Sequence, residues 1–517
     1  MTKPFAQGIP FATKKTNISK ILPMGVLLVA QSVVGSYASA QDNTLSAVVV
    51  KEKAEQAQGK DSIQAKTTTI GKGQQALRDI PQSITVVTEK LIDDRNLDTL
   101  KEALKNTAGI TFLAAEGGEE DIRLRGFSLQ ATGDVFMDGM RDPAFYDRDT
   151  FALDRMEVLR GSASMLFGRG STGGAVNQVS KKAHLIKENQ IDITIGNHEY
   201  ARIQADLNLP LENNNAIRVN AMGNKADNNG SGSEINKQGI AANLRAGIGE
   251  KHEISASLFH LNNQNGINYG LPWVRPNAQS TALDNTVIPI DPSTYFGMAS
   301  DYNHGKGTIA NLEHIFRINP STEIKTQIRK GDFSRDQRAS AIRWNAPSNN
   351  TTPGATRVQN KPTLITDLNN NTRLYRGTNN KIQELDQLLF QSDLNTQFEG
   401  WGLQHELIAG VDFAQDKKTV FATRDASQGS KVANKAATTL GNPNDGSRVN
   451  EAARLLRVNN QYESSAWGIY AQDTVKINSV FKMVGGLRYD SLKGDYDSYA
   501  NPVGLIANGK KSSYQMN

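Results

Sequence analysis

The sequence predicts a β protein in which a short mixed α/β region precedes a transmembrane antiparallel β-barrel. Three observations lead to this fold class. They are an export signal at the N-terminus, alternation of apolar and polar residues from about residue 190 onward, and short connections that alternate with long ones. With 517 residues, 38% of them hydrophobic, the chain is long enough for several domains or one large barrel.

The first forty residues have the layout of a secretory signal peptide. Lys14, Lys15 and Lys20 precede an apolar run over residues 21–30, and small residues close the segment at 38–40. A membrane-spanning helix is the alternative, but it needs about 20 apolar residues. We therefore expect residues 1–40 to be removed on export. The mature chain would then lie in the periplasm or in the outer membrane of a bacterium.

Charge and composition exclude several classes of function. Residues 1–40 hold four lysines and no acidic residue, so the remaining chain has 54 basic and 53 acidic residues. Nucleic-acid binding requires a concentrated basic surface and is not expected. The chain has no cysteine, which excludes disulfides, thiolate metal sites and cysteine nucleophiles.

Alternation of apolar and polar residues is the main evidence for strands. Ala201, Ile203 and Ala205 are separated by Arg202 and Gln204. The same rhythm recurs at 217–221, 242–246, 254–258, 407–413 and 467–471. Such alternation places the two sets of side chains on opposite faces of a sheet. A membrane barrel would turn the apolar face to lipid and the polar face to a wet lumen.

The connections between these segments differ in length. A short turn at Glu212–Asn215 joins two of them, whereas long polar loops are expected at about 263–304, 334–379 and 416–463. Short connections at one end and long ones at the other are typical of an outer-membrane barrel. A soluble β-sandwich or β-solenoid also explains the alternation, but it explains this asymmetry less well.

Residues 41–183 are expected to form a mixed α/β region. Leu97, Leu100 and Leu104 stand at spacings of three and four, which indicates a helix over Leu91–Asn106. Glycines cluster after residue 116, and such clusters fit short strands joined by tight turns.

No motif in the chain indicates catalysis or metal binding. Gly168, Gly170 and Gly173 have the spacing of a dinucleotide-binding fingerprint, but residues 175–180 alternate like a strand where that fingerprint needs a helix. The seven histidines form neither an HxxxH nor an HxH pair, and no nucleophile elbow or pair of acids stands out. We therefore read the three glycines as turns and expect no enzyme, no catalytic residue and no protein-bound metal.

A short β-prone segment directly follows the predicted cleavage site. It precedes a polar stretch that ends near Lys66 and is expected to be flexible. The segment is either an ordinary first strand or an exposed strand that another protein's sheet captures through backbone hydrogen bonds. Its residues are Leu45, Ser46, Ala47, Val48, Val49 and Val50.

Together, these motifs resemble those of TonB-dependent outer-membrane siderophore receptors. Leu45–Val50 resembles the TonB box, and Asp79–Val87 resembles the opening of the plug domain. Further plug motifs follow in family order at 122–127, 136–139, 154–168 and 177–182, and barrel-strand motifs occur at 470–473 and 486–490. Arg141–Pro143 and Asn268–Pro272 are most similar to the catecholate-siderophore branch.

The resemblance implies an N-terminal α/β plug domain inside a transmembrane antiparallel β-barrel. The family barrel has about 22 strands, of which about half are expected in this chain. The implied division is a signal peptide (1–40), a TonB box and flexible linker (41–66), a plug domain (67–183) and a partial barrel (184–517). Unpaired barrel edges are costly in hydrocarbon, so we expect the sequence to be a fragment or a truncated gene product.

The resemblance also implies a function in iron acquisition at the bacterial outer membrane. The full receptor would bind ferric siderophores, of catecholate type, and transport them with energy supplied by TonB, ExbB and ExbD. Iron would arrive inside the siderophore, so no cofactor is expected, and outer-membrane lipid would surround the barrel. The alternatives are a TonB-dependent receptor for another cargo, such as haem, cobalamin or a glycan, and a passive porin-like barrel.

The resemblance places ligand-binding residues at outward plug tips and in barrel loops. Aromatic and basic side chains suit an anionic ferric catecholate. The candidates are Glu116, Gly117, Gly118, Glu119, Ser128, Leu129, Gln130, Thr132, Phe145, Tyr146, Arg148, Tyr269, Trp273 and Arg275. Arg125 and Arg160 are expected to face barrel carboxylates and to lock the plug in place.

Overall fold

The structure is a computed structural model. It describes residues 60–113, 120–129, 133–142, 146–227, 232, 234–281, 284–344, 364–424, 429–430, 432, 434–499 and 510–516. These residues belong to one compact unit, Lys51–Asn517. The predicted signal peptide and the candidate TonB box at 45–50 lie outside the described residues. Among the helices described, none is long and apolar enough to cross a membrane.

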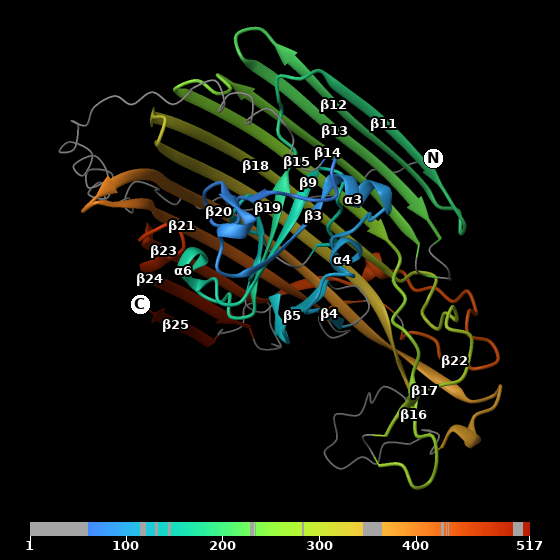
Figure 1. Ribbon diagram of the computed structural model, residues 1–517. Coiled ribbons are helices and arrows are strands. Elements are labelled where there is room, and N and C mark those ends of the chain that lie inside the picture. The colour runs from blue at the N-terminus through green and yellow to red at the C-terminus, as the bar shows by residue number, and fades with distance from the viewer. Residues whose placement is uncertain are drawn as a thin grey trace. The chain divides into compact units, whose positions relative to one another are not determined.

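The first domain is a small α/β assembly built around a five-stranded sheet with the order β3-β9-β10-β7-β8. Strand β10 runs parallel to β7, and the other pairs are antiparallel. Figure 1 shows these elements in blue to cyan. Their bounds are β1 (Thr67–Thr68), β2 (Gln75–Ala76), η3 (Leu77–Asp79), β3 (Ser83–Thr88), α3 (Glu89–Asp94), α4 (Leu100–Leu104), β4 (Ile110–Leu113), β5 (Asp121–Leu124), β6 (Phe127–Ser128), β7 (Val135–Met137), β8 (Met140–Arg141), β9 (Leu153–Arg160), α6 (Ser164–Phe167) and β10 (Gly174–Ser180).

The helical part of this domain differs from the expectation of one helix over 91–106, which is wrong. The chain forms two short helices, and Asn96 between them has a left-handed φ of 47°. The second helix begins at a capping box, in which the Thr99 side chain accepts from the backbone of Glu102 and the Glu102 side chain accepts from the backbone of Thr99. The helices pack on the sheet through a core that includes Leu100, Leu104 and Met156.

The glycine cluster forms turns, as predicted. Gly168 ends α6 with a φ of 75°, and Gly170 follows with a φ of 86°. Strand β10, not a helix, comes next, which confirms that this is no dinucleotide-binding fingerprint. At Gly174 an added Cβ would lie 2.0 Å from the carbonyl oxygen of Leu159, so the close approach of β10 and β9 requires glycine.

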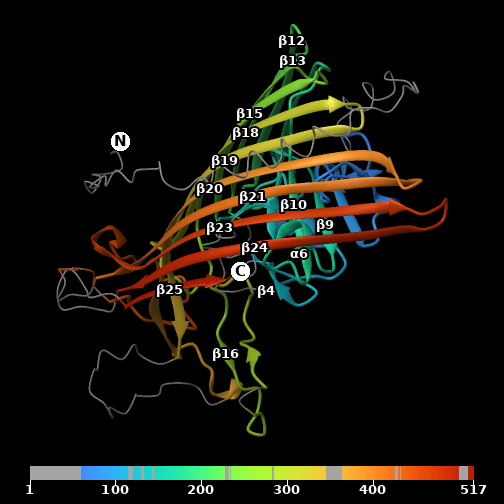
Figure 2. The ribbon, with the colours of Figure 1, turned by 90° about the vertical axis from the view of Figure 1, so that its left-hand side faces the viewer.

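In the described residues, thirteen strands form one large sheet. Neighbours along the chain pair antiparallel, and β11 and β25 stand at the two ends of the order. Figures 1 and 2 show this sheet as a curved wall, with plug elements such as β9 and β10 against one of its faces. The strands are β11 (Glu188–Ile195), β12 (Ala201–Leu211), β13 (Asn215–Ala226), β14 (Ile235–Ala246), β15 (His252–Asn265), β18 (Tyr302–Asn319), β19 (Thr322–Arg343), β20 (Arg373–Gly400), β21 (Leu403–Thr423), β23 (Leu456–Lys476), β24 (Lys482–Ser498) and β25 (Lys510–Met516), with β22 (Thr438–Thr439) paired to β20.

The two faces of the wall have the polarity that the alternation predicts for a membrane barrel. Ile203 is 51% exposed on the outer face, whereas its neighbour Arg202 is 3% exposed on the inner face. Leu258, Leu312 and many other large apolar side chains are likewise exposed on the outer face. Many exposed large apolar side chains on the outer face, over a polar inner face, are the reverse of the arrangement in a soluble protein and suit a hydrocarbon environment.

Leu258→Arg tests this outer belt. We expect the charge to destabilise the folded full-length receptor by about 2–4 kcal/mol if residue 258 lies near the bilayer midplane, because arginine is then exposed to hydrocarbon. Urea titration of the receptor in lipid vesicles measures the change. Leu258→Met, which keeps volume and polarity, is the matched control. Equal stability of both variants would show that this face does not meet lipid.

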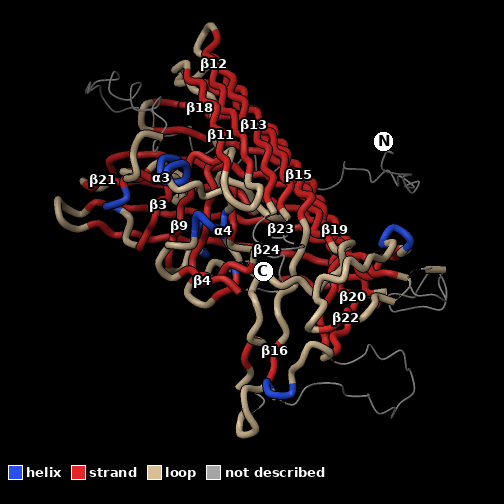
Figure 3. The backbone as a smooth tube through the Cα atoms, turned by 90° about the vertical axis from the view of Figure 1, so that its right-hand side faces the viewer, coloured by secondary structure: helices blue, strands red, loops and turns tan. Residues whose placement is uncertain are grey.

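Connections alternate between short and long, also as predicted. A turn at 212–214 joins β12 to β13, while much longer segments join β15 to β18, β19 to β20 and β21 to β23. The long segments contain β16 (Trp273–Val274), β17 (Thr286–Val287), η4 (Ile365–Asp367) and η6 (Glu451–Ala453). Figure 3 shows described parts of these segments, β16 among them, projecting beyond one end of the wall.

The expected loop bounds are too wide, because the strands extend further than the alternation indicates. Strands β19 and β20 remain paired as far as Arg343↔Tyr375, inside the loop expected at 334–379. In that extension polar residues follow one another, as at Asp336, Gln337 and Arg338. Around residues 336–338 both faces are polar, so the hydrogen-bonded ladder continues there without an apolar-polar signal in the sequence.

Candidate functional site: the plug–wall interface and the loop cap

Basic residues of wall strands β12 to β14 pair with plug carboxylates. Arg202 on β12 holds Asp149 at 2.7 and 3.0 Å through its two terminal nitrogens. Lys237 on β14 lies 2.6 Å from Asp147. The residues Arg202, Asp149 and Lys237 are buried, and breaking one partner of such a pair typically costs about 3–5 kcal/mol. These ion pairs therefore hold the plug in one position against strands β12 to β14.

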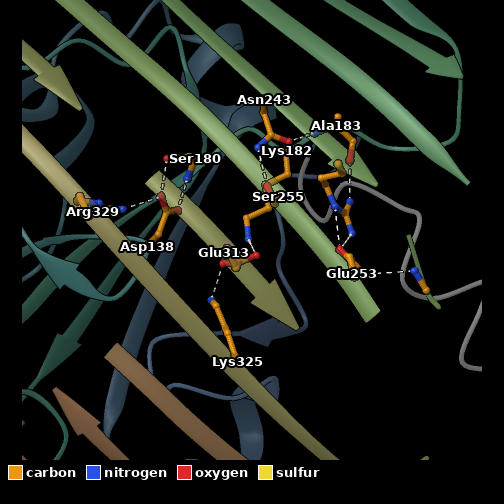
Figure 4. A network of polar contacts seen from close by, with 12 residues as sticks. Asp138, Ser180, Lys182, Ala183, Asn243, Glu253, Ser255, Glu313, Lys325 and Arg329 are labelled. Carbon is orange, nitrogen blue, oxygen red and sulfur yellow. Dashed lines mark hydrogen bonds and ion pairs between the residues drawn. The ribbon is translucent and has the colours of Figure 1, made fainter. Parts of the chain in front are cut away.

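A second set of polar contacts continues this interface across β18 and β19 (Figure 4). Lys182, just after β10, lies 2.6 Å from Glu313, which Lys325 approaches from the next strand at 3.1 Å. Arg329 donates to the carbonyl oxygen of Met137 at 2.8 Å and lies 3.3 Å from the carboxylate of Asp138. These contacts tie the end of the plug to the middle of the wall.

A buried charge cluster joins α3 to strands β12 and β13. Lys181 lies 2.8 Å from Glu89 and 3.0 Å from Asp206, while Arg218 lies 2.6 Å from Asp206. Burial lowers the pKa of Lys181, but Glu89 and Asp206 outweigh it, so that pKa is raised and the ammonium stays charged.

Inside the plug, Arg148 and Tyr146 belong to a closed polar cluster. Arg148 lies 2.5 Å from Glu120 and 2.7 Å from Asp142, and the Tyr146 hydroxyl donates to Asp142 at 3.1 Å. Gln178 also donates to Asp142, at 3.0 Å. Burial raises the pKa of Glu120, and Arg148 opposes that rise. The cluster satisfies its own charges in the absence of ligand.

This placement corrects the expectation that Leu129, Tyr146 and Arg148 lie at outward tips. Arg148 is 2% exposed, Tyr146 is 3% exposed and Leu129 is in the plug core at 0%. The Tyr146 ring packs on Phe333 of β19 with centroids 5.3 Å apart. Ser128 is half-buried and donates to Asp121 at 3.3 Å. Whether any of the four contacts a ligand stays a prediction.

The other plug-tip candidates fall outside the described residues. They are Glu116, Gly117, Gly118, Glu119, Gln130, Thr132 and Phe145.

The three loop candidates lie together in the connection from β15 to β18. Trp273 is 61% exposed, and its carbonyl oxygen accepts from the Trp344 indole at 2.8 Å. The Tyr269 hydroxyl accepts from the Asn379 side chain. Arg275 donates to the carbonyl oxygen of Ala278 at 3.0 Å. Of the three candidates, Trp273 presents the large exposed aromatic surface.

Trp273→Ala is expected to weaken ferric-siderophore binding and to leave assembly unchanged. The indole is exposed and its carbonyl makes the contact with Trp344, so the loop keeps its backbone support. Binding titration of the purified full-length receptor measures the effect. Trp401→Ala, which removes a still more exposed indole from the short turn between β20 and β21, is the matched control. Unchanged affinity for Trp273→Ala would remove this residue from the site.

The long loops are packed together into a cap, which the sequence did not predict. Val274, Ile288, Phe296, Trp344 and Leu374 form one buried cluster. The cap also holds buried ion pairs. Lys435 lies 2.9 Å from Asp301, and Arg376 lies 2.8 Å from Asp445.

Arg125 and Arg160 lie close to one another on the plug. Arg160 donates to the carbonyl oxygen of Ala108 at 2.7 Å and to Ser83 at 3.3 Å. Burial and the neighbouring Arg125 lower the pKa of Arg160. Within the described residues neither arginine lies in an ion pair, so their locking role stays a prediction. Most of the ion pairs between plug and wall in the described residues are arranged the other way round from this expectation. In them the wall supplies the cation and the plug supplies the carboxylate.

A cavity of about 230 Å³ lies between the plug and strands β20 to β24. Its lining includes Lys72, Phe136, Arg141, Phe167 and Arg488. Burial lowers the pKa of Lys72, and Asp393 and Asp412 offset this only in part. No group of three or more metal-ligating side chains occurs in the part of the chain that the structure describes.

Known proteins are similar in sequence to this chain over most of its length. The chain is 26% identical over 432 residues to the catecholate siderophore receptor Fiu of Escherichia coli (strain K12), covering 81% of this chain and 54% of Fiu. It is 24% identical over 519 residues to the probable TonB-dependent siderophore receptor PiuA of Acinetobacter baumannii, covering 97% of this chain and 65% of PiuA. The chain thus spans about half to two thirds of the length of these curated relatives.

Solved structures show the same fold. The open form of the ferric-catecholate import receptor Fiu from E. coli K12 matches with a TM-score of 0.71 at 23% identity, over 85% of this chain and 67% of that one. The siderophore receptor PiuA from A. baumannii matches with a TM-score of 0.74 at 21% identity, over 89% of this chain and 64% of that one.

Two family matches cover most of the described chain. Residues 76–175 match the TonB-dependent Receptor Plug Domain, and residues 245–515 match the TonB dependent receptor-like β-barrel. The second match alone covers more than half of the chain. The predicted combination of plug and barrel is confirmed, and the chain belongs to the TonB-dependent receptor family.

Proposed function

We propose that the full protein is an outer-membrane receptor and TonB-coupled transporter for ferric siderophores, of catecholate type. The observation that carries the proposal is a plug domain tied by buried ion pairs to the polar inner face of a wall whose outer face is apolar. Such a plug suits a transporter that opens only on demand. Relatives named for catecholate siderophores and for a TonB-dependent siderophore receptor support the choice of cargo.

The chemistry needs no catalytic step and no resident cofactor. A siderophore wraps its iron, so the protein would contact the organic shell through aromatic and basic side chains of the loop cap, Trp273 among them. TonB, acting with ExbB and ExbD, would capture residues 45–50 by adding a strand and transmit force to the plug. The protein would thus be a transporter and not an enzyme, in keeping with its receptor family.

Growth on defined iron sources tests the cargo. Cells that lack their own siderophore receptors and express the full-length protein should grow under iron limitation with a ferric catecholate and fail with haem. A strain carrying the empty vector is the control. Growth on haem alone would favour the alternative of a TonB-dependent receptor for another cargo.

Conductance in planar bilayers tests the second alternative, a passive porin. The ion pairs between plug and wall predict a closed pore, so the purified full-length receptor should show no steady open-channel current. A stable large conductance in the absence of TonB would favour the porin.

A further inference from the structure

Strands β19 and β20 form a two-stranded ribbon that continues well beyond the plug. On the face that carries the odd-numbered residues, Phe333 of β19 packs on the plug residue Tyr146. From there the ladder runs without a register shift to its last pair, Arg343↔Tyr375. Arg343 stands ten positions after Phe333, which corresponds to about 30 Å of strand. The tip of the ribbon is therefore distant from the plug and lies among the segments of the loop cap.

The back face of the ribbon, which carries the even-numbered residues, is covered by the cap and its charges are neutralised. Arg376 of β20 is 2% exposed and donates to Asp445 of the β21–β23 connection at 2.8 and 3.0 Å. Arg338 of β19 is also buried and donates to Asp336 at 2.9 Å. Leu374 belongs to the apolar cluster of the cap. These contacts hold the ribbon against the cap in one position.

The front face, which carries the odd-numbered residues, presents two arginines that have no carboxylate partner. Arg343 ends β19 and Arg373 begins β20, and both residues are exposed. Within the described residues neither of them lies in an ion pair, in contrast to the arginines of the back face. Tyr375 stands directly opposite Arg343 in the ladder, and the Arg373 guanidinium lies 5.4 Å from the centre of its ring. One phenol ring is thus flanked by two guanidinium side chains.

Small residues keep the front face open beside Arg343. A Cβ added to Gly377 would lie 3.0 Å from Nε and 3.4 Å from Cζ of Arg343, so the guanidinium lies close against the backbone of β20. Ala341 stands opposite Gly377 in the ladder. The two arginines and the tyrosine therefore border a shallow surface that large side chains do not fill.

This arrangement suits a ligand that is both anionic and aromatic. A guanidinium donates paired hydrogen bonds to anionic oxygens and stacks on aromatic faces, and the tyrosine adds a ring contact. Like charges on neighbouring strands also repel one another, and a bound anion relieves that repulsion. A ferric catecholate offers negative oxygens and aromatic rings together, whereas a neutral aliphatic chelate offers neither.

We propose that Arg343, Arg373 and Tyr375 form a subsite for the anionic rings of the cargo, and that this subsite selects aromatic, negatively charged chelates. The ion pairs of the back face fix the ribbon, so the subsite is formed before the cargo arrives. The inference rests on the proposed transport function, and it adds which residues choose the cargo. Trp273, on the β15–β18 connection, is a separate contact.

Removal of the two charges tests the subsite. In the purified full-length receptor, Arg343→Gln with Arg373→Gln should weaken binding of iron(III) tris-catecholate about 100-fold, at about tenfold for each charge-assisted hydrogen bond lost. Binding of a neutral iron(III) tris-hydroxamate should stay as weak as in the wild type. Arg448→Gln is the matched control, because it removes another exposed arginine of the cap, from the β21–β23 connection.

Ionic strength gives a second readout of the same variants. Since salt screens exposed charges, we expect it to weaken catecholate binding by the wild type and to have little effect on the double variant. Wild-type affinity in the double variant would overturn the proposal. An equal loss in Arg448→Gln would overturn it as well, because the cap would then act through its overall charge. If the wild type binds neither chelate, the proposed function itself fails, and the subsite fails with it.

Thiol protection locates the bound chelate on the ribbon, because the chain has no cysteine of its own. Ala341 is on the front face and Thr378 is exposed on the back face, one register step away, so Ala341→Cys and Thr378→Cys form a matched pair. Gallium(III) tris-catecholate, which does not oxidise thiols through its metal, should slow labelling by a soluble maleimide at residue 341 and leave residue 378 unchanged. Protection of both residues, of residue 378 alone, or of neither would contradict the proposal.

Discussion

Val48→Pro abolishes iron uptake in the full-length receptor and leaves ligand binding unchanged; this is the largest effect that we expect. TonB would pair with the backbone of residues 45–50, and proline removes an N–H donor and interrupts the strand ladder. The ligand would bind at the loop cap, and the first described plug strand begins later, at Thr67. Uptake of labelled ferric siderophore and equilibrium binding on whole cells measure the two effects separately.

Val48→Ala is the matched control, because a side-chain change should be tolerated where the backbone makes the contact. Normal uptake by the proline variant would show that this segment is not the coupling strand. Loss of binding as well as uptake would identify it as an ordinary structural strand.

Arg148→Ala should destabilise the plug by about 3–5 kcal/mol, because Glu120 and Asp142 would be left buried without their cation. Urea titration followed by protease digestion of the plug measures this change. Arg123→Ala is the control. Arg123 is partly exposed and lies 3.5 Å from Asp121, so its loss should cost about 0–1 kcal/mol.

The same variants decide how Arg148 acts. If Arg148 only stabilises the plug, the loss of siderophore binding in Arg148→Ala should match the fraction of receptors whose plug is unfolded. If Arg148→Ala instead abolishes siderophore binding while the stability of the plug is unchanged, Arg148 contacts the ligand directly.

The fold was predictable because its main signal is local. Ile203 and Arg202 are neighbours in sequence, and lipid and lumen force them onto opposite faces, so the alternation alone gives the strand and its orientation. The signal stops where both faces are polar, as around residues 336–338, so the alternation does not predict the extensions of β19 and β20. The break between α3 and α4 does have a local signal in the sequence, because Thr99 and Glu102 have the spacing of a capping box. The leucine spacing across the same residues favours one continuous helix and hides that signal.

The interface between plug and wall was not predictable, since its partners are far apart in the chain. Arg202 and Asp149 are separated by 53 positions, and Lys182 and Glu313 by 131. Neither residue of such a pair differs in sequence from an ordinary solvated charge. The family resemblance located the segments that carry Tyr146 and Arg148, but only the packing of β19 and the charges of Glu120 and Asp142 show that these side chains turn inward.

Uptake of radiolabelled ferric catecholate by cells carrying the full-length gene, with and without TonB, is the most direct test of a plugged, TonB-coupled transporter. We predict saturable uptake in cells with TonB, and binding without uptake in cells that lack it. Uptake at the same rate in both strains would contradict the account, because a plug tied to the wall by buried ion pairs should not open without an external force.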